Sequence, residues 1–255
     1  MASPLFDLTG KVAIVTGSSK GIGKSIAEQL ALQGAKVVIS SRKLPNCEAV
    51  ADGIRKQGGQ AIAVGCNISE KAQLEKLVAE TRKAFGAIDI VVCNAASNPY
   101  YGPTEKMPDD AFTKIMQNNI LSNIWLINLC LPDMRAKKDG AVIIVSSIGG
   151  LRGTAVLGAY GISKAADMAL TRNLAIELGP DNIRVNAIAP GLVKTDFARA
   201  LWENREYLEK RLLTAPLRRI GEPDDIGGIA VMLASKAGAF ITGQTIVADA
   251  GVTIA

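Results

Sequence analysis

The sequence predicts an α/β fold in which a doubly wound, parallel sheet of seven strands is covered by helices on both faces. Short apolar runs alternate along the chain with longer stretches of helical patterning. This alternation is typical of βαβ units, which build a parallel sheet between two helical layers. The chain has 255 residues, of which 48% are hydrophobic and 21% charged, so it can bury the core that such a sheet requires.

Seven apolar runs are the predicted strands. They span residues 12–15, 37–39, 61–64, 88–92, 142–145, 185–188 and 245–247. Sites in sheets of this kind lie at the carboxyl ends of the strands.

The chain has no internal repeat, low-complexity tract or linker rich in Pro, Gly or Ser. We therefore predict a single domain over residues 1–255. Its cofactor half is expected at roughly 10–145, and its catalytic and substrate half at roughly 146–255.

Residues 195–216 interrupt the alternation. They mix charged side chains with Phe197, Leu201, Trp202 and Tyr207. This amphipathic mixture predicts a mobile cover over the substrate. A static surface helix is the alternative.

A glycine-rich turn follows the first predicted strand. Gly17, Gly21 and Gly23 are spaced Gly-x3-Gly-x-Gly, and a helical pattern over residues 26–31 comes directly after them. Glycine allows a tight turn and a close approach of the backbone to a ligand, while the free amides and the dipole at a helix start attract a pyrophosphate. A plain turn between a strand and a helix needs only one glycine. Three glycines favour the dinucleotide site of a Rossmann-type fold.

Tyr160 and Lys164 are one helical turn apart in a segment with helical patterning, and Ser147 comes shortly before them, after a predicted strand. A four-residue step places both side chains on one helix face, so the ammonium of Lys164 favours the anion of the Tyr160 phenol. The spacing predicts a proton donor, although an ordinary solvated Tyr and Lys pair has the same spacing.

Two residue types exclude whole classes of chemistry. The chain contains no histidine, which excludes Ser-His-Asp hydrolysis, Cys-His proteolysis and histidine-bound zinc. Proton transfer is left to Tyr, Lys, Ser and the carboxylates. The four cysteines are widely spaced and form no Cys-x2-Cys pair, which predicts reduced, buried thiols and no metal site. They are Cys47, Cys66, Cys93 and Cys130.

These motifs together resemble the short-chain dehydrogenases and reductases. Residues 16–23 resemble the cofactor loop of that family, and residues 94–96 resemble its Asn-Ala-Gly motif with the last glycine replaced. The resemblance runs over roughly residues 10–250. It implies a catalytic set of Asn119, Ser147, Tyr160 and Lys164. It assigns to the cofactor Gly17, Ser19, Lys20, Gly21, Ile22, Gly23, Ser41, Arg42, Lys43, Asn67, Ile68, Asn94, Ala95, Ala96, Tyr160, Lys164, Pro190, Gly191, Val193 and Thr195.

The resemblance also implies a role for each catalytic residue. Tyr160 exchanges a proton with the substrate oxygen, helped by the positive field of Lys164, which also bonds the nicotinamide ribose. Ser147 holds the substrate oxygen, and Asn119 holds a water that links Lys164 to solvent. A hydride passes between nicotinamide C4 and the carbonyl carbon.

The end of the second predicted strand favours NADP(H) over NAD(H). An NAD site of this kind usually has an acid there, whereas this chain reads Ser41-Arg42-Lys43. Arg42 suits a 2′-phosphate through paired, charge-assisted hydrogen bonds, and Lys20 adds a second cation. The alternative is that Arg42 and Lys43 are solvated turn residues. Asn67 is expected near the adenine.

Several segments resemble, within the family, the branch of NADPH-dependent carbonyl reductases of the retinal-reductase type. They are residues 41–43, 94–102, 145–148 and 201–202. The resemblance implies reduction of ketones, aldehydes or diketones. The carboxyl end departs from the branch: it has no Ser-Arg-Leu type peroxisomal signal, and Asp249-Ala250-Gly251 stands where relatives commonly have Asp-Gly-Gly.

Two other functions stay open. A 3-oxoacyl-[acyl-carrier-protein] reductase shares every catalytic residue, and Arg135, Lys137 and Lys138 offer charge for an acidic carrier, although a solvated helix end explains them as well. A non-catalytic NADPH-binding sensor is the third reading, although such proteins typically lose the Tyr or Lys.

Charge and hydropathy predict where the protein works and with what. The net charge of +5 is scattered, which argues against nucleic acid and leaves a small-molecule substrate. Residues 1–10 have no signal-peptide pattern and no apolar run approaches the length of a membrane span, so we expect a cytoplasmic protein that does not enter a membrane. The family resemblance implies a homotetramer, and the apolar content of residues 120–131 and 165–178 is consistent with helices that pair between subunits.

Overall fold

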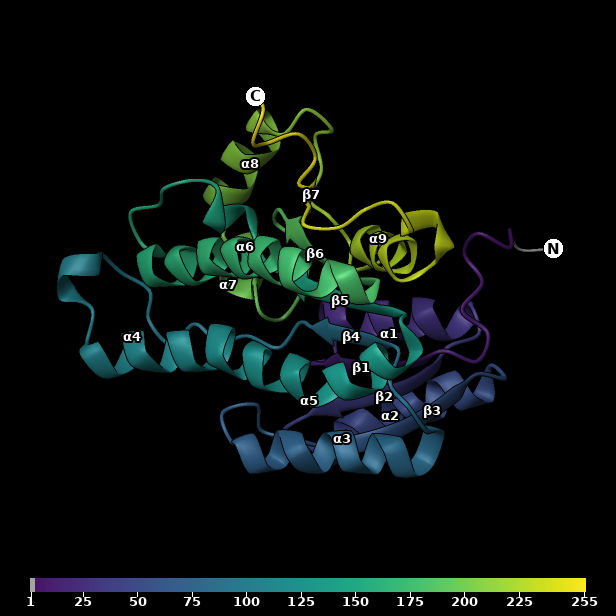
Figure 1. Ribbon diagram of the computed structural model, residues 1–255. Helices are drawn as coiled ribbons and strands as arrows, with labels where there is room; N and C mark the ends of the chain where they lie inside the picture. Colours follow the sequence, from purple (N-terminus) through teal and green to yellow (C-terminus); the bar gives the residue numbers. More distant parts are fainter. Residues whose placement is uncertain (1–2) are drawn as a thin grey trace.

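The computed structural model describes residues 3–255 and contains a sheet of seven parallel strands in the order β3-β2-β1-β4-β5-β6-β7 (Figure 1). The strands are β1 Val12–Thr16, β2 Lys36–Ser41, β3 Gln60–Gly65, β4 Ile90–Cys93, β5 Gly140–Val145, β6 Ile183–Pro190 and β7 Thr245–Ala248. Each of the seven predicted apolar runs corresponds to one strand. The predicted fold class is confirmed.

Helices cover both faces of the sheet (Figure 1). The main helices are α1 Gly21–Leu32, α2 Leu44–Lys56, α3 Lys71–Phe85, α4 Asp109–Met116, α5 Ser122–Lys137, α6 Gly158–Leu178 and α9 Asp224–Ala234. Buried side chains of α1, α2 and α9 pack on one face of the sheet. Those of α3, α5 and α6 pack on the other.

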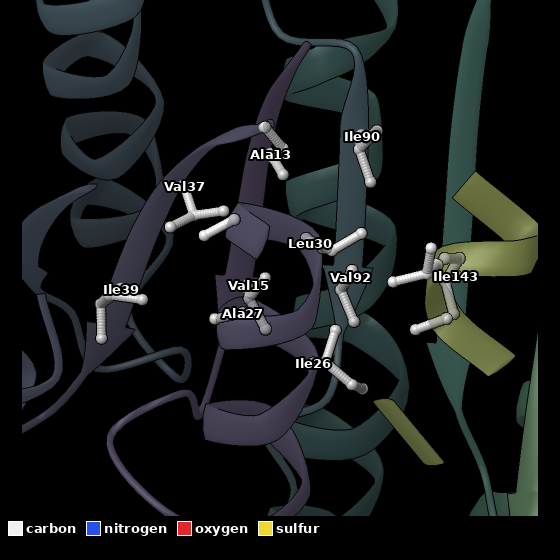
Figure 2. Packing of buried hydrophobic residues seen from close by; sticks show 14 of the residues in the cluster. Ala13, Val15, Ile26, Ala27, Leu30, Val37, Ile39, Ile90, Val92 and Ile143 are labelled. Carbon is white, nitrogen blue, oxygen red and sulfur yellow. The ribbon is translucent and has the colours of Figure 1, made fainter. Parts of the chain in front are cut away.

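Alternate residues of each strand supply the two cores. In β1, Ala13 and Val15 face α1, while Val12 and Ile14 face the opposite helical layer. Figure 2 shows Ile26 and Leu30 of α1 among side chains from β1, β2, β4 and β5. Because both faces of the sheet are buried, the strands read in the sequence as nearly continuous apolar runs.

The fourth strand begins later than predicted. The apolar run at 88–92 includes Asp89, and the strand starts only at Ile90. The Asp89 side chain is 4% exposed, accepts a hydrogen bond of 2.9 Å from the Val12 amide and pairs with Lys137 at 2.7 Å. The acid therefore anchors the start of β4 at the amino-terminal edge of the sheet.

The predicted cover, residues 195–216, forms two short helices, α7 Arg199–Trp202 and α8 Arg205–Thr214. Within these two helices no residue is buried. Few buried apolar contacts are expected of a segment with low local stability. That the segment is mobile stays a prediction.

The four cysteines are all buried, free thiols, as predicted. Burial raises the pKa of Cys66 to about 11, so this thiol stays protonated near neutral pH. Within residues 3–255, no group of three His, Cys, Asp or Glu side chains could hold a metal ion. No helix in the same part of the chain is long and apolar enough to cross a membrane.

Candidate active site

The predicted site residues lie along one edge of the sheet, at the carboxyl ends of its strands. The strand order places Asn67 after β3, Arg42 after β2, Gly17 after β1, Asn94 after β4 and Ser147 after β5. An edge of this kind forms the crevice in which doubly wound folds bind ligands. The five residues form a row that suits an extended ligand.

The glycine loop is shaped by contact with Asn94. The Asn94 Nδ2 donates hydrogen bonds to the carbonyl oxygens of Thr16 and Gly17, at 2.9 and 3.2 Å. A Cβ atom on Gly23 would lie 2.4 Å from that nitrogen, and one on Gly17 would lie 2.9 Å from it. Gly17 and Gly23 therefore leave room for the side-chain amide of Asn94, the residue after β4. The Asn94 side chain holds the loop, a role that its assignment to the cofactor did not include.

The start of α1 has the properties of a phosphate site. Gly21, the first residue of the helix, has φ +57°, and the capping residue Lys20 makes no side-chain cap hydrogen bond. The first amides of a helix have no intrahelical acceptors, and the helix dipole makes this end positive. A Cβ on Gly21 would lie 3.2 Å from Cγ2 of Thr195, so side-chain volume here would intrude on the entrance. These residues fit a pyrophosphate.

The charged residues predicted to read the 2′-phosphate differ in their surroundings. Arg42 and Lys43 follow β2 and are exposed. Lys20 instead pairs with Asp196 of the cover at 2.9 Å. The hydrogen bond from Lys20 holds the pKa of Asp196 below its ordinary value. In this arrangement Lys20 connects the glycine loop to the cover.

The residues assigned to the adenine side lie after β3. The side-chain Oδ1 of Asn67 accepts a hydrogen bond of 3.3 Å from the Ser69 backbone amide. The Asn67 backbone amide donates a hydrogen bond of 2.8 Å to Gln73 Oε1. Ile68 packs against the core formed with α3 and α5. The backbone of this turn is therefore fixed, which holds the Asn67 side chain at the edge beyond β2.

Ser147 and Tyr160 are brought together by a glycine between their elements. Ser147 Oγ accepts a hydrogen bond of 3.0 Å from the Gly149 amide, in the short helix Ile148–Gly150. A Cβ on Gly149 would lie 3.4 Å from Ser147 Oγ and 3.9 Å from two ring carbons of Tyr160. The Ser147 hydroxyl and the Tyr160 ring therefore both lie beside Gly149. Because the Ser147 oxygen accepts from the backbone, its hydroxyl hydrogen is free to be donated.

Lys164 is buried beside Tyr160. Its Nζ lies 5.7 Å from the centre of the Tyr160 ring, and the residue is only 3% exposed. The ammonium donates to the Val145 carbonyl and to Asp167 Oδ2, each at 2.9 Å. Burial alone would lower the pKa of Lys164, but the charges of Asp167 and Tyr160 outweigh it and raise this pKa.

Asn119 lies in a π-helical segment, Gln117–Leu121, between α4 and α5. Its Nδ2 donates to Ser97 O at 3.1 Å and to Ser163 Oγ at 3.0 Å, and its Oδ1 accepts from the Ser97 amide at 2.8 Å. The side chain therefore joins the loop after β4 to α6. π-Helical turns are rare and frequent at functional sites. The water-holding role of Asn119 stays a prediction.

Sequence reasoning missed Asp167, which is fully buried and contacts Lys164. A signal existed: an acid three residues after Lys164 falls on the inner face of a long helix, together with Met168 and Thr171. A buried acid requires a partner, and the nearest cation on that face is Lys164.

The last group of predicted cofactor residues, from Pro190 to Thr195, leads from the end of β6 into the cover. Pro190 ends β6, and a Cβ on Gly191 would lie 2.8 Å from the Asp249 backbone, so only glycine fits there. Val193 is 4% exposed, and Thr195 borders the glycine loop as described above. The loop thus leads from the end of β6 to the start of α1.

A cavity of about 190 Å³ lies beside this loop, under α8. It is lined by residues of the loop, of α8 and of the carboxyl end, among them Val193, Arg211 and Val252. Ser147, Tyr160 and Lys164 are not part of its lining. The cavity therefore adjoins the candidate site without containing its proton donor.

Comparisons with known proteins identify the family of the chain. A family model described as enoyl-(acyl carrier protein) reductase matches residues 17–253. Dehydrogenase/reductase SDR family member 4 from Oryctolagus cuniculus is 40% identical over 244 residues, which are 96% of this chain and 94% of that protein. The Homo sapiens protein of the same name is 40% identical over 96% of this chain and 88% of its own length.

Solved structures match over nearly the whole chain. A 7 alpha-hydroxysteroid dehydrogenase, complexed with NADH and 7-oxo glycochenodeoxycholic acid, has a TM-score of 0.95 at 35% identity, over 98% of this chain and 97% of its own. A gluconate 5-dehydrogenase from Burkholderia cenocepacia, in complex with NADP and tartrate, has a TM-score of 0.94 at 30% identity, over 99% and 98%. The chain therefore belongs to the short-chain dehydrogenase/reductase family of oxidoreductases.

Proposed function

We propose that the protein is an NADP(H)-dependent oxidoreductase that transfers a hydride between nicotinamide and a carbonyl or alcohol substrate, acting as a reductase of ketones, aldehydes or diketones. The observation that carries this proposal is the cluster of Ser147, Tyr160 and Lys164 at the carboxyl end of β5, two strands from the glycine loop. A phenol, a hydroxyl and an ammonium gathered at such an edge form a device for moving a proton to and from an oxygen.

Each catalytic side chain has one task in this mechanism. The nicotinamide, when bound, supplies or accepts the hydride. The Tyr160 hydroxyl gives its proton to the substrate oxygen in reduction and takes it back in oxidation. Lys164 stabilises the phenolate that forms, because its buried ammonium lies 5.7 Å from the ring centre. Ser147 donates a hydrogen bond to the same substrate oxygen.

The choice of NADP(H) is supported by Arg42. This guanidinium is exposed after β2, next to the glycine loop after β1, and no carboxylate follows the strand. Both cofactors occur among the structural relatives, one of which holds NADH and another NADP. The charge at the end of β2 is therefore the basis for choosing between them.

The cofactor assignment is tested by Arg42→Ser. Loss of a charged hydrogen-bonding partner weakens binding by about 1.5–3 kcal/mol, so kcat/KM for NADPH should fall roughly tenfold to a hundredfold while that for NADH stays nearly constant. Lys83→Ser is the matched control, because Lys83 is exposed near the end of α3, at the opposite edge of the sheet. Equal losses with both cofactors would contradict the assignment.

A 3-oxoacyl-[acyl-carrier-protein] reductase remains the second candidate, and the description of the matching family model favours acyl-carrier chemistry. The structure argues against the basic dock suggested by the sequence. Arg135 and Lys138 both pair with Asp181, at 3.0 and 2.6 Å, and Lys137 pairs with Asp89 at 2.7 Å. Arg135 and Lys137 lie in the last turn of α5 and Lys138 directly follows it, at the edge of the sheet opposite the catalytic cluster. A free carbonyl compound is therefore the better candidate.

The substrate class is tested by NADPH consumption with ketones, diketones and aldehydes, beside a 3-oxoacyl and a 2-enoyl carrier thioester. We expect turnover of free carbonyl compounds to exceed that of both thioesters. The reverse order would establish the carrier-dependent reaction. Tight NADPH binding with no turnover of any compound would indicate the non-catalytic sensor.

The remaining proposals concern assembly and location. We propose one domain that works as a homotetramer in the cytoplasm on a small-molecule substrate, with no nucleic-acid or membrane partner. Exposed apolar side chains on the outer faces of the helices support the assembly: Ile176 of α6 is 78% exposed and Leu121, just before α5, is 41% exposed. Sedimentation of the purified protein measures the subunit number directly.

A further inference from the structure

The side chain of Asp167 lies in the interior between α5 and α6, in direct contact with the candidate catalytic lysine. It is 0% exposed, and its Oδ2 accepts a hydrogen bond of 2.9 Å from Lys164 Nζ. The same ammonium donates to the Val145 carbonyl at 2.9 Å. Two of its three N–H groups are thus bonded to groups other than Tyr160, and their acceptors fix the position of Nζ.

A continuous path of hydrogen bonds leads from Asp167 to the π-helical segment. Asn123 of α5 donates from Nδ2 to Asp167 Oδ1 at 3.2 Å and to the backbone carbonyl of Asn119 at 2.6 Å. Lys164, Asp167, Asn123 and Asn119 are therefore linked in sequence through side chains of the protein. Burial raises the pKa of Asp167, while the charge of Lys164 and the donors on both carboxylate oxygens act in the opposite direction and favour the charged form.

The other groups around Asp167 do not supply a second charge. From α6 the titratable groups that act on it or on its partner are Lys164 and Tyr160, and from β4 the nearest is Cys93. Burial raises the pKa of the Cys93 thiol far above neutral, so it stays uncharged. Helix α5 and the π-helical segment Gln117–Leu121 face the pair with the amides Asn123 and Asn119. The ion pair is therefore the local source of charge in this part of the interior.

Packing alone does not account for an acid at this position. Removing charged groups from water is costly, and replacing a whole buried ion pair by apolar side chains of the same volume is often neutral or stabilising. On packing grounds alone, a charged Asp167 is therefore less favourable than an apolar residue. We look for its role in the effect of its charge on Lys164. The hydrogen bond between Lys164 Nζ and Asp167 Oδ2 is the contact through which the charge affects the lysine.

We propose that Asp167 is a positioning residue that orients Lys164 and reduces the positive field that Lys164 exerts on Tyr160. This inference rests on the proposed function, in which Tyr160 exchanges the proton. The negative charge of Asp167, which contacts the same ammonium, opposes the formation of a negative phenolate on Tyr160. Asp167 therefore makes the phenol harder to ionise than the lysine alone would, and shifts the working range of the enzyme in the oxidation direction toward higher pH.

The test is a titration of the Tyr160 phenolate by ultraviolet absorbance, in the wild type and in Asp167→Asn. The chain has four tyrosines, so Tyr160→Phe in each background is subtracted to isolate Tyr160. With Lys164 still protonated, removing one charge several ångströms away at an effective dielectric constant near 20 should lower the titration midpoint by about one to two pH units. The acid limb of the rate profile for alcohol oxidation should move by the same amount. A midpoint that stays in place or rises overturns the proposal.

Asn123→Leu is the matched control, because it breaks the path to Asn119 while the Lys164 ammonium, the larger influence on Asp167, still favours the charged carboxylate. We expect its Tyr160 midpoint to match that of the wild type, and a shift as large as that of Asp167→Asn would contradict a charge effect. Asp167→Leu needs no hydrogen-bond partner, so it provides the same measurement if the Asn variant fails to fold. The absorbance titration requires no turnover. Failure of the proposed function, seen as absence of NADPH oxidation by the wild type, is therefore distinguishable from failure of this inference.

Discussion

The rings of Phe197 and Tyr160 lie 6.0 Å apart, centre to centre, with their planes inclined at 41°. Phe197 belongs to the segment predicted to cover the substrate, and Tyr160 is the candidate proton donor on α6. Tilted rings at this separation attract each other. The contact therefore places one side chain of the cover directly over the proposed reaction centre, although Phe197 remains 60% exposed.

We predict that Phe197→Ala raises the KM for the carbonyl substrate more than it lowers kcat. An aromatic pair contributes about 0.5–1.5 kcal/mol, so KM should rise roughly twofold to tenfold in steady-state measurements. Phe240→Ala is the control, because Phe240 is fully exposed near the carboxyl end. A large loss of kcat with unchanged KM would show that Phe197 acts in the transition state instead of in substrate binding.

We predict that Tyr160→Phe leaves NADPH binding nearly intact and removes most turnover. The variant keeps the ring that packs on Phe197 but has no proton to donate, and a general acid typically contributes a factor of about 10²–10⁴. Cofactor fluorescence measures binding and NADPH absorbance measures turnover. Tyr207→Phe in α8 controls for loss of a hydroxyl elsewhere. Full activity of Tyr160→Phe would eliminate Tyr160 as the proton donor.

The fold was predictable because its strands are buried on both faces. A run such as 142–145 has an apolar residue at every position in the sequence, and all of β5 is buried in the structure. The predicted run at 88–92 starts too early, because Asp89 belongs to the turn before β4. A strand that is buried on both faces is apolar along its whole length, so it can be identified from a short stretch of sequence.

The site was predictable only in part, because several contacts join residues far apart in the chain. Spacing within one helix predicted that Tyr160 and Lys164 share a face, and Lys164 Nζ does lie near the Tyr160 ring. No local pattern pairs Asn123 with Asp167, which are 44 residues apart, or Lys20 with Asp196. The π-helical turn around Asn119 has no sequence signal that distinguishes it from an ordinary helix.

We predict that Ala250→Gly stabilises the protein. Ala250 has a φ of +60°, a left-handed conformation that strains a residue with a Cβ. Glycine relieves about 1–2 kcal/mol of strain and costs about 0.5–1 kcal/mol in the unfolded chain, so the net gain is about 0.5–1 kcal/mol. Urea unfolding measures it. Ala239→Gly, at an ordinary negative φ of −58°, should be neutral or destabilising. A loss of stability in Ala250→Gly would show that the methyl group contributes packing that outweighs its strain.

We predict that the stabilising contribution of Asp225 is lost as the pH falls below about 4 and the carboxylate becomes protonated. Two hydrogen bonds from Arg219, at 2.6 and 2.7 Å, together with one from the Glu222 amide, lower the pKa of Asp225 from 3.8 to about 2. A carboxyl whose pKa is lower in the folded than in the unfolded protein adds stability above the unfolded value and loses it as the pH falls toward the folded value. Because Asp225 is 36% exposed, solvent screening reduces its contribution to about 1 kcal/mol.

Urea unfolding near pH 5 and near pH 2.5 should therefore show the wild type losing about 1 kcal/mol more than Asp225→Asn over this interval. Glu209→Gln is the matched control, because Glu209 pairs with Arg205 on α8, where both side chains are well exposed. That substitution should leave the wild-type pH dependence unchanged. If Asp225→Asn loses as much stability as the wild type, the acid sensitivity arises from other carboxyl groups, and the contacts with Arg219 do not stabilise the charged form of Asp225.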